Sequence, residues 1–338
     1  MVTNFPPNRV GKGWAMPILV VAFALFLSGC SEKKPRVYRV GILSGVDALA
    51  NVADGFIAEM TKLGYIEGKN IVYDMQKVNA EPAEERRIAD KFVADRADLI
   101  FVFPTEPAVA AKAATQGTSI PVVFANAGIE GVNLVESVRQ PGGHITGVRF
   151  PGPDQTVKRF EFLLELAPHI KRLYITYDVN YPLTRGVFEA LRPVAASLDV
   201  TLVEVPVTSV EGIQADLQAR AELDDIGMDA ILIMPELLSQ SPTTWPLISK
   251  FAAEHKVPIG GALGFTADHG AVFSYAPDTL ELGRLAAPLA DKILRGTPAG
   301  TIPLVTPENY LRLNYKRAQE LGLTVPQSLL SLAREIIR

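Results

Sequence analysis

The fold of this chain is decided by the stretch Asp98-Leu99-Ile100-Phe101-Val102-Phe103-Pro104. One acidic residue precedes five apolar residues, four of them aromatic or β-branched, and a proline ends the run. A short apolar run without alternation, bounded by a turn residue, is typical of a strand that is buried on both faces. We therefore expect this strand to lie inside a parallel sheet that helices cover on both sides.

A second stretch repeats the first one further along the chain. Asp229-Ala230-Ile231-Leu232-Ile233-Met234-Pro235 has the same order of acid, apolar run and proline. Each stretch is followed by another apolar strand with a proline, Ile120-Pro121-Val122 in the first case and Val257-Pro258-Ile259 in the second. The repetition predicts two similar α/β lobes. The alternative is a chance similarity between ordinary buried strands.

The segments around these strands alternate between strand-like and helical patterns. Strands are expected over 38–43, 70–74, 99–103, 121–124 and 145–148 in the first lobe, and over 173–177, 201–205, 230–234 and 257–259 in the second. Helices are expected over 48–63, 81–96, 107–116, 183–198, 210–223 and 245–255. Because strands that alternate with helices form right-handed βαβ units, both lobes should contain parallel, Rossmann-like sheets. The remaining chain predicts a strand over 271–275, a helix over 279–294, extended runs at 303–305 and 311–314, and a final helix after Pro326.

The beginning of the chain has the pattern of a secretory signal. Arg9 and Lys12 precede the apolar run 16–27, which is too short to span a membrane because a span needs ~20 residues. The stretch Leu27-Ser28-Gly29-Cys30 resembles the lipobox of bacterial lipoproteins. That resemblance implies a signal peptide over 1–29, a lipidated Cys30 with a tether over 30–36, and export to the cell envelope. The alternative is an uncleaved apolar helix with a buried cysteine.

Composition excludes several classes of function. The formal net charge of −4 speaks against a nucleic-acid groove, which needs a basic face. Cys30 is the only cysteine, so its lipidation would leave no disulfide and no cysteine-based metal site. The chain has no Gly-x-Ser-x-Gly, phosphate-binding-loop or His-Glu-x-x-His motif, and its four histidines are scattered. We expect a monomer with no catalytic residues, no metal and no cofactor.

The candidate ligand-binding residues follow the predicted strands, because ligands of open parallel sheets lie beyond the carboxyl ends of the strands. They are Ser44, Asp47, Pro104, Thr105, Glu106 and Asn126 in the first lobe, and Tyr177, Asp178, Asn180, Glu236, Gly261 and Tyr275 in the second. The helix N-termini at 44–47 and 105–107 offer N–H groups that suit a carboxylate or a phosphate. In the second lobe the two acids could hold an ammonium group, and the two tyrosines could stack on a ring or a cation.

Each candidate also has a purely structural interpretation. Ser44 and Thr105 could cap helices, and Asp178 could build a turn with Asn180. Both glutamates could be exposed first-turn carboxylates that suit the helix dipole. A tyrosine at the end of a strand could belong to the rim of the core.

Beyond these patterns, the sequence resembles the tryptophan/tyrosine-type substrate-binding proteins of bacterial ABC transporters, over about Val37 to Gly322. The matching stretches are Val40-Gly41-Ile42-Leu43, Gly64-Tyr65-Ile66-Glu67-Gly68-Lys69-Asn70, Asp98-Leu99-Ile100, Ile120-Pro121-Val122-Val123-Phe124, Gln140-Pro141-Gly142-Gly143-His144-Ile145-Thr146-Gly147-Val148 and Leu282-Gly283-Arg284. The resemblance implies the type I periplasmic binding fold, with two lobes that close on a small molecule and present it to a membrane permease. The expected ligand is an amino acid or a related small polar or aromatic compound.

The resemblance also implies where the chain passes between the lobes. Crossovers near Val148, Ala267 and Thr301 give an N-terminal lobe of 37–148 plus 268–300 and a C-terminal lobe of 149–267 plus 301–325, with a C-terminal helix over 326–338. The chain departs from the family at two places. Relatives usually have Gly-Ser-Asp after the position of Pro258, where this chain has Gly260-Gly261-Ala262, and a smaller turn where it has Pro104-Thr105-Glu106. Asp178 and Glu236 are candidates to replace the missing acid.

Two other functions remain open at this point. One is a ligand sensor that reports to a membrane kinase. The other is a secreted α/β hydrolase with Glu106 and Glu236 as carboxylates across the cleft. A repressor of the same fold would need a DNA-binding headpiece, and the signal segment occupies its place.

Overall fold

The computed structural model describes residues 1–7, 36–78 and 81–338. The predicted signal run, Cys30 and all but the last residue of the tether lie outside the described residues. The chain divides into two units, Met1–Val37 and Tyr38–Arg338, and all described helices and strands belong to the second.

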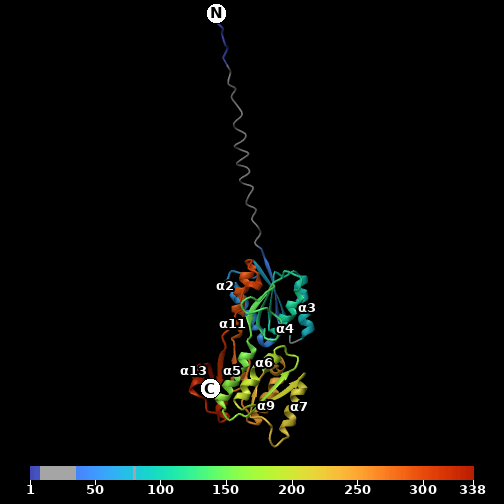
Figure 1. Cartoon of the computed structure of the whole chain (residues 1–338), viewed down its shortest axis with the longest axis vertical. Coiled ribbons are helices and arrows are strands. Elements are labelled where there is room, and N and C mark those ends of the chain that lie inside the picture. Colours follow the sequence, from blue (N-terminus) through green and yellow to red (C-terminus); the bar gives the residue numbers. More distant parts are fainter. Residues whose placement is uncertain (8–35, 79–80) are drawn as a thin grey trace. The chain divides into compact units, whose positions relative to one another are not determined.

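The first lobe contains a five-stranded parallel sheet in the order β2-β1-β3-β4-β5. Its strands are β1 (Tyr38–Ser44), β2 (Ile71–Lys77), β3 (Leu99–Phe103), β4 (Val122–Ala127) and β5 (Ile145–Arg149). The helices α2 (Asn51–Lys62) and α11 (Thr279–Leu294) cover one face, and α3 (Pro82–Ala94) and α4 (Thr105–Ala114) cover the other (Figure 1). The prediction of a parallel sheet covered on both sides is confirmed.

The strand β3 is the centre of this lobe, and all five of its residues are buried. Phe101 stacks on Phe56 of α2 with 4.1 Å between the ring centroids. The helices α2 and α11 pack closely because each presents a glycine to the other. A Cβ on Gly55 would lie 2.0 Å from the carbonyl oxygen of Leu280, and one on Gly283 would lie 2.0 Å from that of Val52.

The second lobe contains a seven-stranded sheet in the order β12-β11-β10-β9-β8-β6-β7. Its strands are β6 (Arg172–Asp178), β7 (Thr201–Val207), β8 (Ala230–Leu232), β9 (Ile259–Gly261), β10 (Phe273–Ala276), β11 (Tyr310–Asn314) and β12 (Ala333–Ile337). All neighbours are parallel except β10 and β11, which are antiparallel. The helices α5 (Gly152–Leu166) and α6 (Thr184–Ser197) cover one face, and α7 (Val210–Ala221) and α9 (Thr244–Glu254) cover the other (Figure 1).

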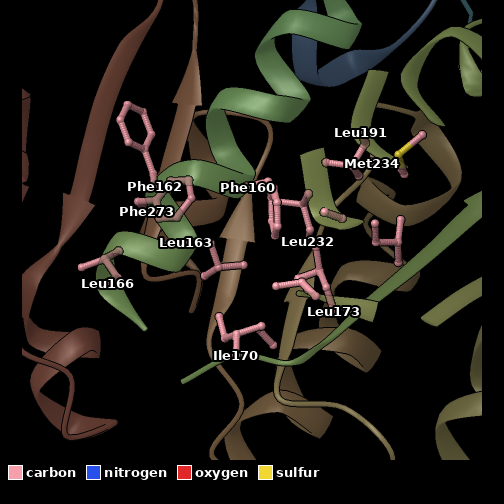
Figure 2. Packing of buried hydrophobic residues seen from close by; sticks show 14 of the residues in the cluster. Phe160, Phe162, Leu163, Leu166, Ile170, Leu173, Leu191, Leu232, Met234 and Phe273 are labelled. Carbon is pink, nitrogen blue, oxygen red and sulfur yellow. The ribbon is translucent and has the colours of Figure 1, made fainter. Parts of the chain in front are cut away.

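The core under α5 shows how this lobe is held together. Phe160, Leu163 and Leu166 of α5 lie among the strand residues Leu173, Leu232 and Phe273 (Figure 2). These α5 positions are spaced by three residues, which places them on one helix face. The helix α5 was not among the helices expected from the sequence, although this apolar spacing was present in the chain.

The observed structure corrects the predicted lobe boundaries. The segment 268–276 was expected in the first lobe, but β10 pairs with β9 and β11 in the second sheet. The segment 301–305 was expected in the second lobe, but Ile302 and Leu304 are buried against the first, and Val305 bridges to Val148. The chain therefore crosses back after β10 and again after Val305.

The predicted C-terminal helix over 326–338 is also wrong. A short helix, α13 (Gln327–Leu332), is followed by β12 (Ala333–Ile337). The segment forms a strand because it pairs with β11, which would otherwise be the edge of the sheet. Arg312 of β11 also forms an ion pair with Glu335 of β12. Four further helices, α5, α8 (Leu237–Gln240), α10 (Phe265–Asp268) and α12 (Tyr315–Glu320), were not predicted.

Candidate ligand-binding site

A cavity of about 630 Å³ is lined by residues that follow strands of both sheets. The first lobe contributes the loop after β1, the beginning of α4 and the end of β4. The second contributes Tyr181, the α8 segment and the loop after β9. This is the position that open parallel sheets provide for ligands, at the carboxyl ends of their strands.

The structure places five of the twelve predicted residues on the cavity wall, which are Pro104, Thr105, Glu106, Asn126 and Glu236. Ser44, Asp47, Asp178, Gly261 and Tyr275 are outside the cavity lining, and Tyr177 and Asn180 line a separate hollow beside α6.

The residues outside the cavity have structural roles. The Asp178 carboxylate accepts a 2.8 Å hydrogen bond from the Asn180 backbone N–H, so this acid builds a turn. The Tyr275 ring packs edge-on against Phe162 at 5.2 Å, at the rim of the core. Gly261 is required by packing, since a Cβ there would lie 2.0 Å from Thr266 Oγ1.

Ser44 and Thr105 are not helix caps, contrary to the structural alternative. Ser44 is buried, and its hydroxyl donates to the Val46 carbonyl at 3.2 Å. The Thr105 hydroxyl accepts a 3.1 Å hydrogen bond from the Gly128 backbone N–H, and no side chain caps α4. Both residues therefore hold the loops around the cavity in place.

Glu106 stands in the first turn of α4 and is partly buried. Burial raises the pKa of its carboxyl above the ordinary range, its own backbone N–H lowers it, and the charge of Asp178 raises it again. The Glu106 carboxyl group therefore lies at the N-terminus of α4, where the helix dipole is positive.

Glu236 is 2% exposed, so it is not the exposed first-turn carboxylate of the structural alternative. Its carboxylate accepts hydrogen bonds from the backbone N–H groups of Leu238 and Ser239 and from the Ser239 hydroxyl. Burial raises its pKa to about 7, although those hydrogen bonds act in the opposite direction and Asp178 adds to the rise. Glu236 caps α8 and still lines the cavity.

Two amides on the wall have acceptors without donors. Asn126 lies at an irregularity of β4, with a φ of 53°, and its Oδ1 is buried. Gln240 uses its Nε2 to donate to the carbonyls of Met234 and Glu236, and its Oε1 is buried. Within the described part of the chain, neither oxygen has a hydrogen-bond partner. Buried acceptors of this kind are costly unless something donates to them.

The cavity lining also includes residues that the sequence did not predict, among them Phe150 and Tyr181. Phe150 follows β5, and Tyr181 stands in the β6–α6 loop, a position with no motif around it. Burial, with the nearby charges of Glu106 and Glu236, raises the Tyr181 pKa well above its ordinary value. Tyr181 therefore remains a neutral hydroxyl beside two carboxyl groups.

Of the positive charges near the cavity, Arg312 is paired and Arg159 is buried, whereas Arg334 is exposed. Among the described lining residues these charges are Arg312 and Arg334, both from the β11–β12 edge. Arg312 pairs with Asp268 and Glu335, and the Arg334 guanidinium lies 4.0 Å from the centre of the Tyr310 ring. Arg159, near Tyr181, is fully buried, and burial lowers its pKa to about 9.

Metal ligands do not gather in the described residues, where no group of three or more His, Cys, Asp or Glu side chains could hold an ion. A search of the same residues for a helix long and apolar enough to cross a membrane finds none.

Comparisons with known proteins agree on one family. The family model described as ABC transporter substrate binding protein matches residues 39–337. The tyrosine-binding protein of Clostridioides difficile (strain R20291) is 28% identical over 309 residues, which cover 85% of this chain and 86% of that protein.

Two solved structures show the same architecture. A conserved domain protein from Vibrio cholerae has a TM-score of 0.79 at 26% identity, over 89% of this chain and 100% of that one. An ABC domain from Streptococcus pneumoniae in complex with L-Trp also has a TM-score of 0.79, over the same shares of the two chains. Its identity is 23%, so this second similarity concerns the fold.

Fold and cavity together define a two-lobed solute-binding protein of the type I periplasmic class. The chain belongs to the family of ABC transporter substrate-binding proteins. It is thus an extracytoplasmic ligand-binding protein of a transport system that works with an ABC permease. This confirms the predicted family and function over the sensor and hydrolase alternatives.

Proposed function

We propose that this protein is the lipid-anchored receptor of an ABC importer and that it carries one small molecule in the cavity between its lobes. The strongest support is that both lobes contribute residues to the cavity wall. Glu106 and Asn126 come from the first lobe, and Tyr181, Glu236 and Gln240 come from the second. A ligand that contacts both lobes favours the closed arrangement over the open one by the difference in its contacts. The permease would then recognise the closed receptor.

Within the predicted site we propose Pro104, Thr105, Glu106, Asn126 and Glu236 as ligand contacts, joined by Tyr181 and Gln240. The cavity volume of about 630 Å³ lies in the range of small-molecule sites. The tyrosine-binding relative is the reason to begin a ligand search with amino acids and related small compounds.

A thermal-shift screen of amino acids, amines, nucleosides and sugars tests the proposal. A ligand present at about 100 times its dissociation constant adds ~2.7 kcal/mol to the free energy of unfolding. The ligand found should be recovered chemically unchanged after incubation with the protein, and deletion of the gene should abolish uptake of that ligand. Conversion of the ligand, or uptake that continues at the original rate, would contradict the proposal.

The anchor and the location are part of the same proposal. The signal peptide 1–29, lipidation of Cys30 and the tether 30–36 would hold a monomeric receptor at the periplasmic or outer surface of the membrane. Several acyl chains on one residue anchor stably, whereas one chain holds only marginally. Cys30→Ser should therefore move the protein from the membrane fraction to the soluble fraction. The matched variant Ser31→Ala should stay with the membrane, and membrane association of both variants would refute the lipid anchor.

A further inference from the structure

Several groups on the cavity wall accept hydrogen bonds. Glu106 and Glu236 present carboxyl groups from opposite lobes. The buried Asn126 Oδ1 and Gln240 Oε1 have no donor within the described part of the chain. Both N–H bonds of the Gln240 amide point toward backbone carbonyls, so its free atom is the acceptor. A ligand that satisfies this wall must bring donors.

Carboxylate side chains stand at three of the helix N-termini around the cavity, whereas α2, which begins at the lining residue Asn51, has no side-chain cap. Glu106 stands at the beginning of α4, Glu236 caps α8, and Asp278 caps α11 by accepting from the N–H groups of Leu280 and Glu281. A free helix N-terminus is a good site for a ligand carboxylate. At these three helices a ligand carboxylate would meet another negative charge instead.

Among the described residues, neither Glu106 nor Glu236 forms an ion pair, and neither pKa is lowered by a nearby cation. The two arginines of the described wall belong to the β11–β12 edge. Arg312 pairs with Asp268 and Glu335, and the exposed Arg334 lies against the Tyr310 ring. Arg159 is fully covered, lies outside the wall, and donates to the Thr156 hydroxyl at 2.8 Å. Asp178, which is outside the cavity lining, raises the pKa of both Glu106 and Glu236, so its negative charge acts on each of them.

We propose that the cavity selects an organic cation that carries no carboxylate, an amine or a guanidine, in preference to the corresponding amino acid. The cationic group would lie between Glu106 and Glu236 and donate to Asn126 Oδ1 and Gln240 Oε1. Phe150 and Tyr181 would contact the rest of the ligand. This inference rests on the proposed function, because it concerns the ligand of the same cavity.

Matched pairs of compounds that differ by one carboxylate test the inference directly. The pairs are tyramine and L-tyrosine, tryptamine and L-tryptophan, agmatine and L-arginine, and putrescine and L-ornithine. Calorimetry with the purified protein at about pH 8, above the Glu236 pKa of about 7, should show at least one amine that binds at least tenfold more tightly than its amino acid. The inference would be overturned if, in every pair with a compound that binds, the amino acid bound as tightly as the amine or more tightly. It would also be overturned if none of the four amines bound.

A variant distinguishes a direct role of Glu106 from a structural one. Glu106→Gln keeps the size of the side chain and removes its charge, so the ratio of amine affinity to amino-acid affinity should fall at least tenfold. Damage to the fold would weaken the binding of the amine and of the amino acid equally and leave the ratio of their affinities unchanged. The matched variant Glu161→Gln, at an exposed position of α5, should leave the ratio at its original value. An unchanged ratio in Glu106→Gln would overturn the inference.

Different results would refute the inference about the cation and the proposed function. If the protein binds and imports an amino acid, a sugar or a nucleoside, the inference about the cation falls and the proposed function stands. If uptake of every compound that the protein binds continues after deletion of the gene, the proposed function falls, whatever the calorimetry shows.

Discussion

Replacement of Glu236 by glutamine should change how the stability of the ligand-free protein depends on pH. The carboxyl of Glu236 has a pKa of about 7 in the folded protein, against an ordinary value of 4.5. Because the folded state holds this proton more tightly than the unfolded state does, stability is highest below the unfolded pKa and falls as the pH rises through the folded one. The window of the effect lies between these two values.

The magnitude follows from the size of the shift. Each pKa unit corresponds to 1.36 kcal/mol, so the difference between 4.5 and about 7 amounts to roughly 3 kcal/mol of stability lost across the window. Glu236 is 2% exposed, so solvent screening reduces this figure little. Glutamine can still accept one of the two backbone hydrogen bonds at the start of α8 and cannot ionise.

Urea unfolding at about pH 5 and at about pH 8 measures the effect. The natural protein should lose roughly 3 kcal/mol more than Glu236→Gln between these conditions. Burial also raises the pKa of Glu85 to about 7, so both proteins should lose some stability, and the difference between them isolates Glu236. Glu161→Gln, at an exposed site, should follow the natural protein. Parallel pH profiles for the natural protein and Glu236→Gln would refute the reasoning.

Two further substitutions test the packing of the lobes. Gly283→Ala places a methyl carbon 2.0 Å from a carbonyl oxygen of α2, so urea unfolding should show a loss of about 2 kcal/mol. Gly186→Ala, where the nearest atoms lie at 3.7 Å, should instead gain up to about 1 kcal/mol from helix propensity, and equal effects at both sites would contradict the close packing of α2 and α11. Arg312→Met removes the pairs with α10 and β12, so it should cost about 2 kcal/mol and speed amide hydrogen exchange over 333–337. Arg185→Met, at an exposed pair on α6, should change neither, and unchanged exchange in Arg312→Met would show that β12 holds without the pair.

Part of the candidate site was predictable, because position along the chain limits where a residue can lie. Pro104, Thr105 and Glu106 follow a buried strand directly, and residues after parallel strands meet at one edge of the sheet. The same argument also selected Asp178 and Tyr275, which do not line the cavity. Asp178 builds a turn with Asn180, and Tyr275 packs against Phe162 at the rim of the core. Strand position therefore predicts the edge of the sheet, and it does not predict which way a side chain leaves that edge.

Other features of the site had no local signal. Asn126 reaches the wall because β4 is irregular there and its φ is positive, a backbone state that a non-glycine residue seldom adopts. Tyr181 stands in the β6–α6 loop and Gln240 ends the short helix α8, and the paths of both segments depend on the packing around them. The double role of Glu236, a cap that also faces the cavity, required both α8 and the opposite lobe to be in place.

By itself, the sequence determined the architecture: two repeated series of apolar runs, each with the spacing of βαβ units, can bury their apolar surface only as two covered parallel sheets. The tertiary structure alone decided where 268–276 and 333–337 belong, because a short strand joins the sheet edge that offers it hydrogen bonds, and that edge is made by residues distant in the chain. It also decided the charge of the cavity. Glu106 and Glu236 are 130 residues apart in the numbering, and only the folded chain places both on the wall of one cavity, where Asp178 raises the pKa of each.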